Sequence, residues 1–166
     1  MTGRNRLDDL VAGVRSAVQV HADWATTADL VADQLRCRLG SELVEPDLST
    51  TRCLHIEPDG TFSVLALVWQ PGQITRIHDH LTWCAFGVVR GIEREELFDG
   101  ELNPIGVTDN HPGDASGFAP PGDIHRVHNT TDELALSIHI YGTDIARIGS
   151  SVRRYYDQPV LERTAS

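Results

Sequence analysis

Residues 72–84 read GQITRIHDHLTWC and place two histidines, His78 and His80, two positions apart. Side chains alternate between the two faces of a β-strand, so both imidazoles lie on one face if this segment is a strand. A strand face that looks into a barrel would bring both rings within reach of one metal ion. The segment therefore predicts part of a metal site, and the rest of the chain must supply a further ligand.

His125 is the residue that can complete such a site. It lies in residues 113–129, GDASGFAPPGDIHRVHN, where a glycine, a Pro-Pro-Gly turn, the histidine and Asn129 have the spacing of the second sequence motif of the cupin superfamily. Residues 72–91 resemble the first cupin motif, with both histidines and both flanking glycines in place. Three neutral imidazoles suit divalent iron, nickel, copper or zinc. The two blocks together predict a metal site formed by His78, His80 and His125.

Cys84 stands where the first cupin motif has a glutamate. It follows His80 by four positions, so strand alternation places it on the metal-facing side of the next strand. A thiol at that place could be a metal ligand, a mimic of the substrate, a crosslinking partner or a small filler. Without the glutamate the site has histidine ligands and no protein anion, and we expect it to favour anionic donors from a substrate.

The segments around these motifs predict a mainly β protein that follows two helices. Apolar positions recur at helical spacing over residues 7–19 and 28–39, with Gly40 expected to end the second helix and Thr26, Thr27 or Asp29 to cap its start. Short β-rich segments then alternate with turn signals. The expected strands are 52–56, 62–69, 74–77, 84–89, 92–98, 105–108, 115–119, 124–129, 134–141 and a last one within 152–161. We expect one domain over residues 1–166, a cupin jelly-roll barrel at 50–161 preceded by helices within 1–45.

The charge and composition of the chain favour small-molecule partners. Its 166 residues carry 24 acidic and 14 basic side chains, a formal net charge of −10, whereas nucleic-acid binding needs clustered Lys and Arg. The longest apolar run, residues 62–69, is too short to cross a membrane, and residues 1–10 contain no signal-peptide core. We therefore expect a cytoplasmic protein without a nucleic-acid or membrane partner, either a monomer or a weak homo-oligomer.

The chain has three cysteines, Cys37, Cys53 and Cys84, and no Cys-x-x-Cys pair. An odd number without such a pair makes a disulfide framework or a thiolate zinc site a poor interpretation. Cys37 lies within a helical pattern, and we expect it to be buried as a small core residue.

Residues 137–141 contain a further group of polar side chains. Ser137, His139 and Tyr141 alternate with two isoleucines, so a strand would carry hydroxyl, imidazole and phenol on one face. If that face is buried, each group needs a hydrogen-bond partner, and the three can satisfy one another as a relay with Tyr141 nearest the chemistry. The alternative is an exposed polar face. The acidic run at residues 93–96 is interpreted as a solvated strand face of this kind.

These features together resemble the cysteine dioxygenase family of thiol dioxygenases, over residues 51–141. That family is a cupin with Fe(II) held by three histidines and a Ser-x-His-x-Tyr triad in its site. The resemblance implies Fe(II) at the three histidines above and a catalytic triad of Ser137, His139 and Tyr141. In the mammalian type a cysteine forms a thioether with the tyrosine, and Cys84 lies near the matching position.

The resemblance also bears on the substrate. Arg52, in the segment TRCL at residues 51–54, matches an arginine of the cysteine-specific members, and arginine can hold a carboxylate through two hydrogen bonds. Trp83 and the run PPGDIHRV at residues 120–127 resemble the enzymes specific for 3-mercaptopropionate, so Trp83 is a second candidate for substrate contact. The resemblance implies conversion of L-cysteine and O2 to cysteine sulfinic acid, with 3-mercaptopropionate or another small thiol as the alternative substrate.

Two other classes of function would keep the histidines. A different metal-dependent cupin enzyme, such as a nickel or zinc isomerase or a ring-cleaving dioxygenase, would need neither the Ser-His-Tyr group nor Arg52. A non-catalytic cupin that binds or senses a small ligand would tolerate a site without metal, and its histidines would then be structural. Metal analysis and oxygen uptake with a panel of thiols separate the three classes.

Overall fold

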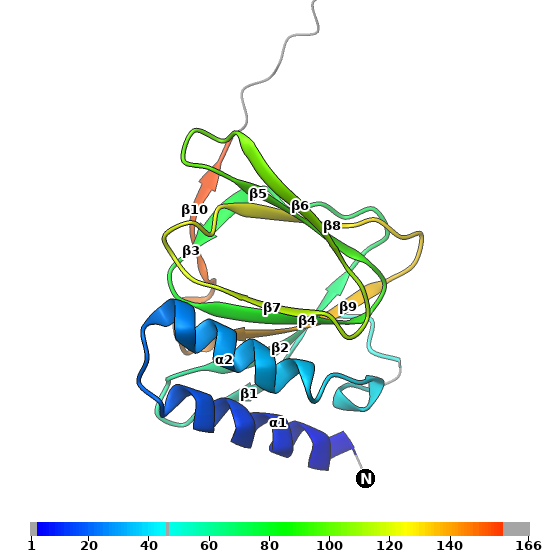
Figure 1. The fold of residues 1–166 in the computed structure, drawn as a ribbon. Helices are drawn as coiled ribbons and strands as arrows, with labels where there is room; N and C mark the ends of the chain where they lie inside the picture. The colour runs from blue at the N-terminus through cyan, green and yellow to red at the C-terminus, as the bar shows by residue number, and fades with distance from the viewer. Residues whose placement is uncertain (1–2, 46, 158–166) are drawn as a thin grey trace, which may run out of the picture.

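The computed structural model describes residues 3–45 and 47–157 (Figure 1). Two helices come first, followed by a short 3-10 turn at Ser41–Leu43 and then by strands. The helices are α1 (Gly3–Val18), α2 (Trp24–Arg36) and α3 (Ile145–Ile148). The strands are β1 (Arg52–Ile56), β2 (Ser63–Trp69), β3 (Ile77–His80), β4 (Cys84–Arg90), β5 (Glu93–Phe98), β6 (Pro104–Asn110), β7 (Ala115–Phe118), β8 (His125–Asn129), β9 (Ala135–Tyr141) and β10 (Val152–Tyr156).

The strands form two antiparallel sheets that face each other across the barrel interior (Figure 1). One sheet has the order β1-β2-β9-β4-β7, and the other has the order β10-β3-β8-β5-β6. Helix α2 packs against β4 and β7, and α1 packs against α2, so both helices lie on the same outer face (Figure 1). This arrangement confirms the predicted mainly β fold with N-terminal helices. Among the described residues, no helix combines the length and the apolar character that crossing a membrane requires.

Strand alternation gives the first sheet two different faces. Ile138 and Ile140 of β9 are fully buried in the apolar core that also includes residues of α1 and α2. Ser137, His139 and Tyr141, at the intervening positions, point the other way, into the barrel. The outer face of this sheet therefore supplies apolar burial, while its inner face can carry polar groups.

Helix α2 lies close to this sheet because two glycines leave room for it. A Cβ atom on Gly117 of β7 would lie 2.3 Å from the backbone oxygen of Ala28. A Cβ atom on Gly87 of β4 would lie 3.1 Å from a methyl carbon of Leu35 in α2, and 2.6 Å from one of Leu39 just after the helix. The Gly117 clash is with backbone, so a larger residue there would force the helix away from the sheet, whereas at Gly87 the leucine side chains would have to move.

The ends of α2 differ from the prediction. Its N-cap is Asp23, whose carboxylate accepts the Thr26 N–H at 2.9 Å, instead of Thr26, Thr27 or Asp29. Asp23 has an extended backbone, which lets it cap the helix several residues before the apolar pattern begins. The helix ends at Arg36, before Gly40, and Cys37 occupies the C-cap. Cys37 is exposed, so the prediction that it is buried was wrong.

The predicted strands match the observed ones within a few residues, with one shift that matters. The strand expected at residues 74–77 is β3, and it begins only at Ile77 and includes both histidines. Ile74 forms an isolated bridge to His128, because the chain leaves a turn around Gly72 and pairs fully only from Ile77 on. The short helix α3 was not predicted. β10 ends at Tyr156, and residues 158–161 of the predicted last strand lie outside the described residues.

Candidate metal centre

The structure brings His78, His80 and His125 together inside the barrel. His78 and His80 lie on β3, and His125 lies on β8 with its Cα directly opposite that of His78. One ring nitrogen from each histidine lies within 4.8 Å of the other two, and all three side chains are buried. Metal–nitrogen bonds are about 2.0–2.1 Å long, so this spacing suits one shared ion. Among the residues that the structure describes, these three histidines are the group of side chains close enough together to hold a metal ion.

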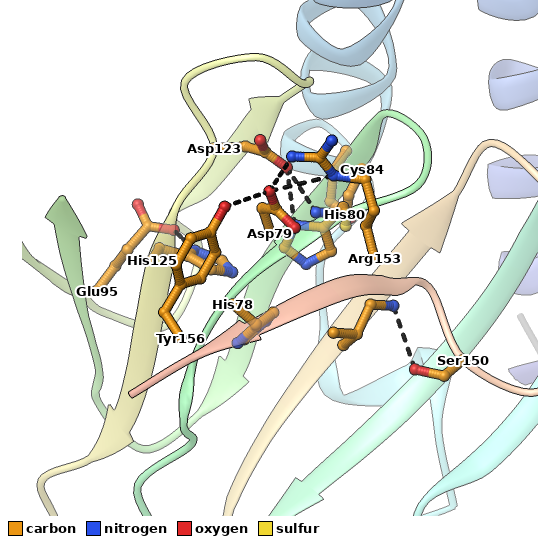
Figure 2. A network of polar contacts seen from close by, with 12 residues as sticks. His78, Asp79, His80, Cys84, Glu95, Asp123, His125, Ser150, Arg153 and Tyr156 are labelled. Carbon is orange, nitrogen blue, oxygen red and sulfur yellow. Dashed lines mark hydrogen bonds and ion pairs between the residues drawn. The ribbon is translucent and has the colours of Figure 1, made fainter. Parts of the chain in front are cut away.

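Hydrogen bonds orient each of these rings through its Nδ1 atom. His78 Nδ1 lies 2.8 Å from the Arg76 carbonyl oxygen. His80 Nδ1 lies 3.1 Å from a carboxylate oxygen of Asp123, and His125 Nδ1 lies 2.7 Å from one of Glu95; each carboxylate stands beside its histidine (Figure 2). With Nδ1 engaged in this way, Nε2 of each ring is left to bind a metal. The donor set therefore fits a divalent transition-metal ion.

The charge state of the rings also suits metal binding. Burial and the neighbouring His125 lower the pKa of His78 to about 4. Burial likewise lowers the pKa of His80, although the hydrogen bond to Asp123 opposes that shift. Only a neutral imidazole has a free lone pair for a metal, so His78 and His80 can act as ligands without first losing a proton near neutral pH.

Asp79 lies between the two histidines and anchors their strand from its other face. Its carboxylate accepts hydrogen bonds from Tyr156, at 2.8 Å, and from Arg153, both on β10 (Figure 2). Burial acts to raise the pKa of Asp79, but these hydrogen bonds outweigh it and leave the pKa lowered. The ion pair fixes β3 against β10, which keeps the ligand pair in place.

Ser137, His139 and Tyr141 form a continuous hydrogen-bonded chain. The Tyr141 hydroxyl lies 3.3 Å from His139 Nδ1, and His139 Nε2 lies 3.0 Å from the Ser137 hydroxyl oxygen. Trp69 Nε1–H donates to the same serine oxygen at 3.0 Å. Every residue of β9 is buried, so the three side chains form the buried relay that the sequence predicted. The alternative of an exposed polar face is wrong. Burial lowers the pKa of His139 to about 3 and raises that of Tyr141, so both side chains are neutral near pH 7.

A cavity of about 450 Å³ joins the histidine cluster to the relay. His139 and Tyr141 line it together with the three clustered histidines, while Leu67, Trp69, Phe118 and Val127 supply apolar wall. Its lining also includes Arg76, whose guanidinium lies over the Tyr155 ring at 4.5 Å. The volume suits a small ligand that could touch the metal position and Tyr141 at the same time.

Cys84 is fully buried and lies directly opposite Tyr141 in the pairing of β4 with β9. It shares a strand face with Phe86, which stacks on His139 at 5.5 Å, so the thiol faces the barrel interior as alternation predicted. It is not part of the described metal cluster. Burial raises the pKa of Cys84 well above its usual range, which disfavours the thiolate that a metal ligand would need.

Arg52 and Trp83 lie away from the described cavity lining. Arg52 pairs with Glu45 at 2.8 Å, and about half of its side chain is exposed. It lies on the edge strand β1 opposite Ala66, whose side chain belongs to the apolar core under the helices. Trp83 is buried in that same core, because it precedes the inward-facing Cys84 and so points to the opposite side. The structure does not bring these two substrate candidates to the histidines.

Four functional candidates were missed from the sequence. Glu93 and Glu95 were assigned to a solvated strand face, but Glu95 contacts His125 and Glu93 has no exposed surface. Asp123 lies in the turn before β8 and contacts His80, a partner that its position two residues before His125 does not reveal. Arg76 likewise precedes His78 by two positions and faces the same cavity.

Comparison with known proteins agrees with this architecture. No protein-family model matches the chain. Over 100 residues the chain is 30% identical to "Cysteine dioxygenase type 1" of Danio rerio; the match covers 55% of this chain and 50% of the relative. The chain thus spans about half the length of this curated relative.

Solved structures give the fold. A mutant of Bacillus subtilis oxalate decarboxylase OxdC superposes with a TM-score of 0.51 at 18% identity, over 63% of this chain and 28% of the decarboxylase. A Cupin 2 conserved barrel domain protein from Salinispora arenicola CNS-205 has a TM-score of 0.44 at 24% identity, over 60% of this chain and 81% of that protein. The chain has the cupin fold. At these identities the structural likeness describes the fold alone.

Proposed function

We propose that this protein is a non-haem iron thiol dioxygenase that converts L-cysteine and O2 to cysteine sulfinic acid. The observation that carries the proposal is that Tyr141, joined through His139 to Ser137, lines the same cavity as the histidine cluster. A histidine cluster alone suits many cupin enzymes, whereas a buried Ser-His-Tyr chain beside it suits the thiol dioxygenases. The local identity to cysteine dioxygenase type 1 supports the same class.

In this proposal His78, His80 and His125 hold Fe(II), and the substrate supplies the anionic donor that the protein does not. Iron, when bound, would lower the pKa of a substrate thiol and activate O2 for addition of both oxygen atoms to sulfur. The Glu95 and Asp123 carboxylates keep the ligand rings oriented. Leu67, Trp69, Phe118 and Val127 would give the substrate an apolar wall to pack against.

Tyr141 has the role of a hydrogen-bond donor to the reacting molecules. Its burial keeps the phenol protonated throughout the working pH range, because the pKa is raised above its ordinary value. His139 and Ser137 behind it fix the position of the hydroxyl. The buried relay therefore supplies an oriented O–H group without placing a negative charge next to the metal.

Arg76 is the basic side chain that we assign to the substrate carboxylate. Both arginines have an acidic partner, Asp157 for Arg76 at 3.0 Å and Glu45 for Arg52 at 2.8 Å, but Arg76 lines the cavity and Arg52, the candidate from family resemblance, does not. The Arg76 guanidinium lies over the Tyr155 ring, and a substrate carboxylate would bind it in place of, or beside, the exposed Asp157 carboxylate; a charge-assisted contact is worth about 1.5–3 kcal/mol. L-cysteine and 3-mercaptopropionate both carry a carboxylate, so 3-mercaptopropionate remains the alternative substrate.

The two arginines can be separated by matched substitutions. We expect Arg76→Gln to raise KM for L-cysteine about 10- to 100-fold, and to change KM for cysteamine, which lacks a carboxylate, much less. Arg52→Gln should leave both values near those of the unchanged protein. A shift of selectivity from cysteine to 3-mercaptopropionate in Arg52→Gln would instead return the carboxylate contact to Arg52.

Oxygen consumption tests the proposal as a whole. The iron-loaded protein should consume O2 in the presence of L-cysteine, and cysteine sulfinic acid should accumulate in equal amount. Parallel reactions with 3-mercaptopropionate and cysteamine rank the thiols, and the metal-free protein is the control. Tight thiol binding without oxygen consumption would show a non-catalytic ligand-binding module, and a bound metal with no response to any thiol would show a different cupin enzyme.

A further inference from the structure

Glu93 is a buried carboxyl group that the proposed reaction does not use. It begins β5 and has no exposed surface. It shares a strand face with Glu95, whose carboxylate contacts His125, so both side chains point into the barrel. Neither carboxylate oxygen of Glu93 has a hydrogen-bond partner among the described residues. An unpaired buried carboxyl group costs stability, and its presence needs an explanation.

The Ser137 hydroxyl is close enough to act on this carboxyl group and lower its pKa, although the two side chains form no hydrogen bond in the structure. Nearby side-chain amides are already used, since Asn110 Nδ2 donates to the backbone oxygen of Glu93 and Asn129 Nδ2 donates to backbone oxygens elsewhere. Ser137 is also the end of the relay opposite Tyr141. Glu93 therefore stands behind the relay, at the end remote from the cavity.

The surroundings favour the neutral form of this carboxyl group. Burial raises the pKa of Glu93 to about 8, and the negative charge of Glu95 on the same strand adds to the shift. The relay residues on β9 offer no compensating positive charge, because burial lowers the pKa of His139 to about 3 and raises that of Tyr141. The Glu93 charge acts on Tyr141 as well, where it raises the phenol pKa.

We propose that Glu93 is a positioning residue whose proton sets the direction of every hydrogen bond along Ser137, His139 and Tyr141. Its function within catalysis rests on the proposed thiol dioxygenase activity, while the hydrogen-bond direction is a property of the protein alone. The inference follows from the contacts of Ser137. This serine accepts the Trp69 N–H, touches His139 Nε2 and adjoins Glu93, so its single proton can go to the histidine or to the carboxylate.

In the proposed active state Glu93 is protonated, its O–H forms a hydrogen bond to the Ser137 oxygen that the structure does not yet show, and the serine donates to His139 Nε2. His139 then carries its proton on Nδ1 and donates it to the Tyr141 oxygen. The Tyr141 proton then points away from His139, toward the cavity and the neighbouring Ser151 hydroxyl. The Ser137 oxygen accepts two hydrogen bonds, from Trp69 and Glu93, and donates one, so the chain is fully satisfied.

When Glu93 ionises, one proton leaves to solvent and each hydrogen bond reverses. Ser137 now donates to the carboxylate and accepts from His139 Nε2–H. The unprotonated Nδ1 of His139 accepts the Tyr141 O–H, which turns away from the cavity. The four side chains then share three protons instead of four. Tyr141 now offers the ligand a hydrogen-bond acceptor and no donor. The ionised form should therefore be the inactive form of the relay.

The tautomer of His139 reports this switch without any turnover. We would label the histidines of the full chain with nitrogen-15, load the protein with Zn²⁺, which is diamagnetic, and record the ring signals at about pH 6 and about pH 9.5. The His139 signals are assigned by their loss in His139→Gln. We expect the Nδ1-protonated tautomer at the lower pH and the Nε2-protonated tautomer at the higher pH.

Two substitutions distinguish ionisation of Glu93 from a general effect of pH on the His139 tautomer. In Glu93→Gln, an isosteric and permanently neutral variant, His139 should keep the Nδ1-protonated form at both pH values. Glu96→Gln makes the same chemical change at a position paired with Arg126, and it should behave as the unchanged protein. A His139 tautomer that stays constant in the unchanged protein, or that switches equally in Glu93→Gln, would overturn the proposal.

If Glu93→Gln folds poorly, infrared spectra of the unchanged protein can still detect the proton on the Glu93 carboxyl group. The unchanged protein should show the carbonyl stretch of a buried carboxylic acid near pH 7, and the band should vanish as the pH passes about 8. With an active preparation, kcat/KM should fall about tenfold per pH unit above that value, with no such fall in Glu93→Gln. If no thiol is oxidised, the tautomer and infrared results still decide the role of Glu93, so the two proposals fail separately.

Discussion

Tyr141 combines a hydroxyl held at a fixed position with a phenol that stays neutral. Removal of that hydroxyl in Tyr141→Phe should lower kcat about 100-fold or more, because a positioned proton donor contributes on this order. Iron content should stay unchanged, since Tyr141 is not part of the metal cluster. Tyr155→Phe, at the half-exposed ring that also lines the cavity, is the matched control and should change kcat little. Equal losses in both variants would remove the special role of Tyr141.

Asp123 acts on the metal through His80, whose Nδ1 and backbone N–H both contact its carboxylate. We expect Asp123→Asn to weaken metal binding about 10- to 100-fold, as loss of a carboxylate partner does at other histidine sites. Competition with a chromophoric chelator measures the change. Asp109→Asn, which removes an exposed ion pair with Arg94, is the control and should leave the affinity unaltered.

Cys84 and Tyr141 face each other across two paired strands, with the thiol fully buried. If turnover joins them as a thioether, O2 is the oxidant, and the Cys84 S–H and one ring C–H are replaced by an S–C bond. The intact mass should then fall by two hydrogen atoms after reaction with thiol and O2. The same deficit in Cys84→Ser would show that the loss arises elsewhere in the chain.

At the level of elements, the contact of α2 with the first sheet depends on glycine. Gly117→Ala should lower the free energy of unfolding by about 1–3 kcal/mol, because the added methyl group would meet the Ala28 backbone and the helix would have to shift. Gly106→Ala on β6 is the control, since its nearest neighbour would be 3.8 Å from the new atom. Thermal unfolding of the metal-loaded proteins measures both, and equal stability of the two variants would contradict the close approach.

The helices and strands were predictable where the apolar pattern follows the burial. The β9 pattern of alternating isoleucines and polar residues indicated one apolar and one polar face, and both are observed. The start of α2 was missed because its cap, Asp23, precedes the apolar positions by several residues. The limits of β3 were missed because pairing with β8 and β10, which no local pattern encodes, sets them.

At the level of the whole molecule, one buried acid makes stability depend on pH. The Glu93 pKa is about 8 in the folded protein against a usual value of about 4.5, so the folded state holds the proton that the unfolded state loses. The contribution of Glu93 to the free energy of unfolding should therefore be greatest below about pH 4.5 and should fall as the pH rises to about 8. The total loss is on the order of 3–5 kcal/mol.

Glu93→Gln should remove this part of the pH dependence. We expect the variant to be more stable than the unchanged protein near pH 8 and closer to it near pH 5, as measured by urea unfolding at a series of pH values. Glu96→Gln serves again as the control. Parallel stability curves for Glu93→Gln and the unchanged protein would show that Glu93 ionises at its ordinary pKa.

The metal ligands could be predicted, but much of what surrounds them could not. Motif spacing identified His78, His80 and His125 because a strand pair and a turn fix their relative positions. Whether an acidic residue of β5 points inward depends on the strands beside it, and charge alone favours solvent, which is why Glu93 and Glu95 were misassigned. Family resemblance located Arg52 in the sequence without telling which side of its strand faces the cavity.

The strand order also governs when the site can come into existence during folding. β9 lies between β2 and β4, and β8 lies between β3 and β5, so the relay and the third histidine both join partners far back along the chain. Such distant pairing forms late, because the entropy of closing long loops must be met first. A partly folded chain therefore offers a metal the β3 histidines without the β8 one. Tight binding of a metal ion by all three histidines should therefore follow the pairing of β8 with β3, when both sheets have closed.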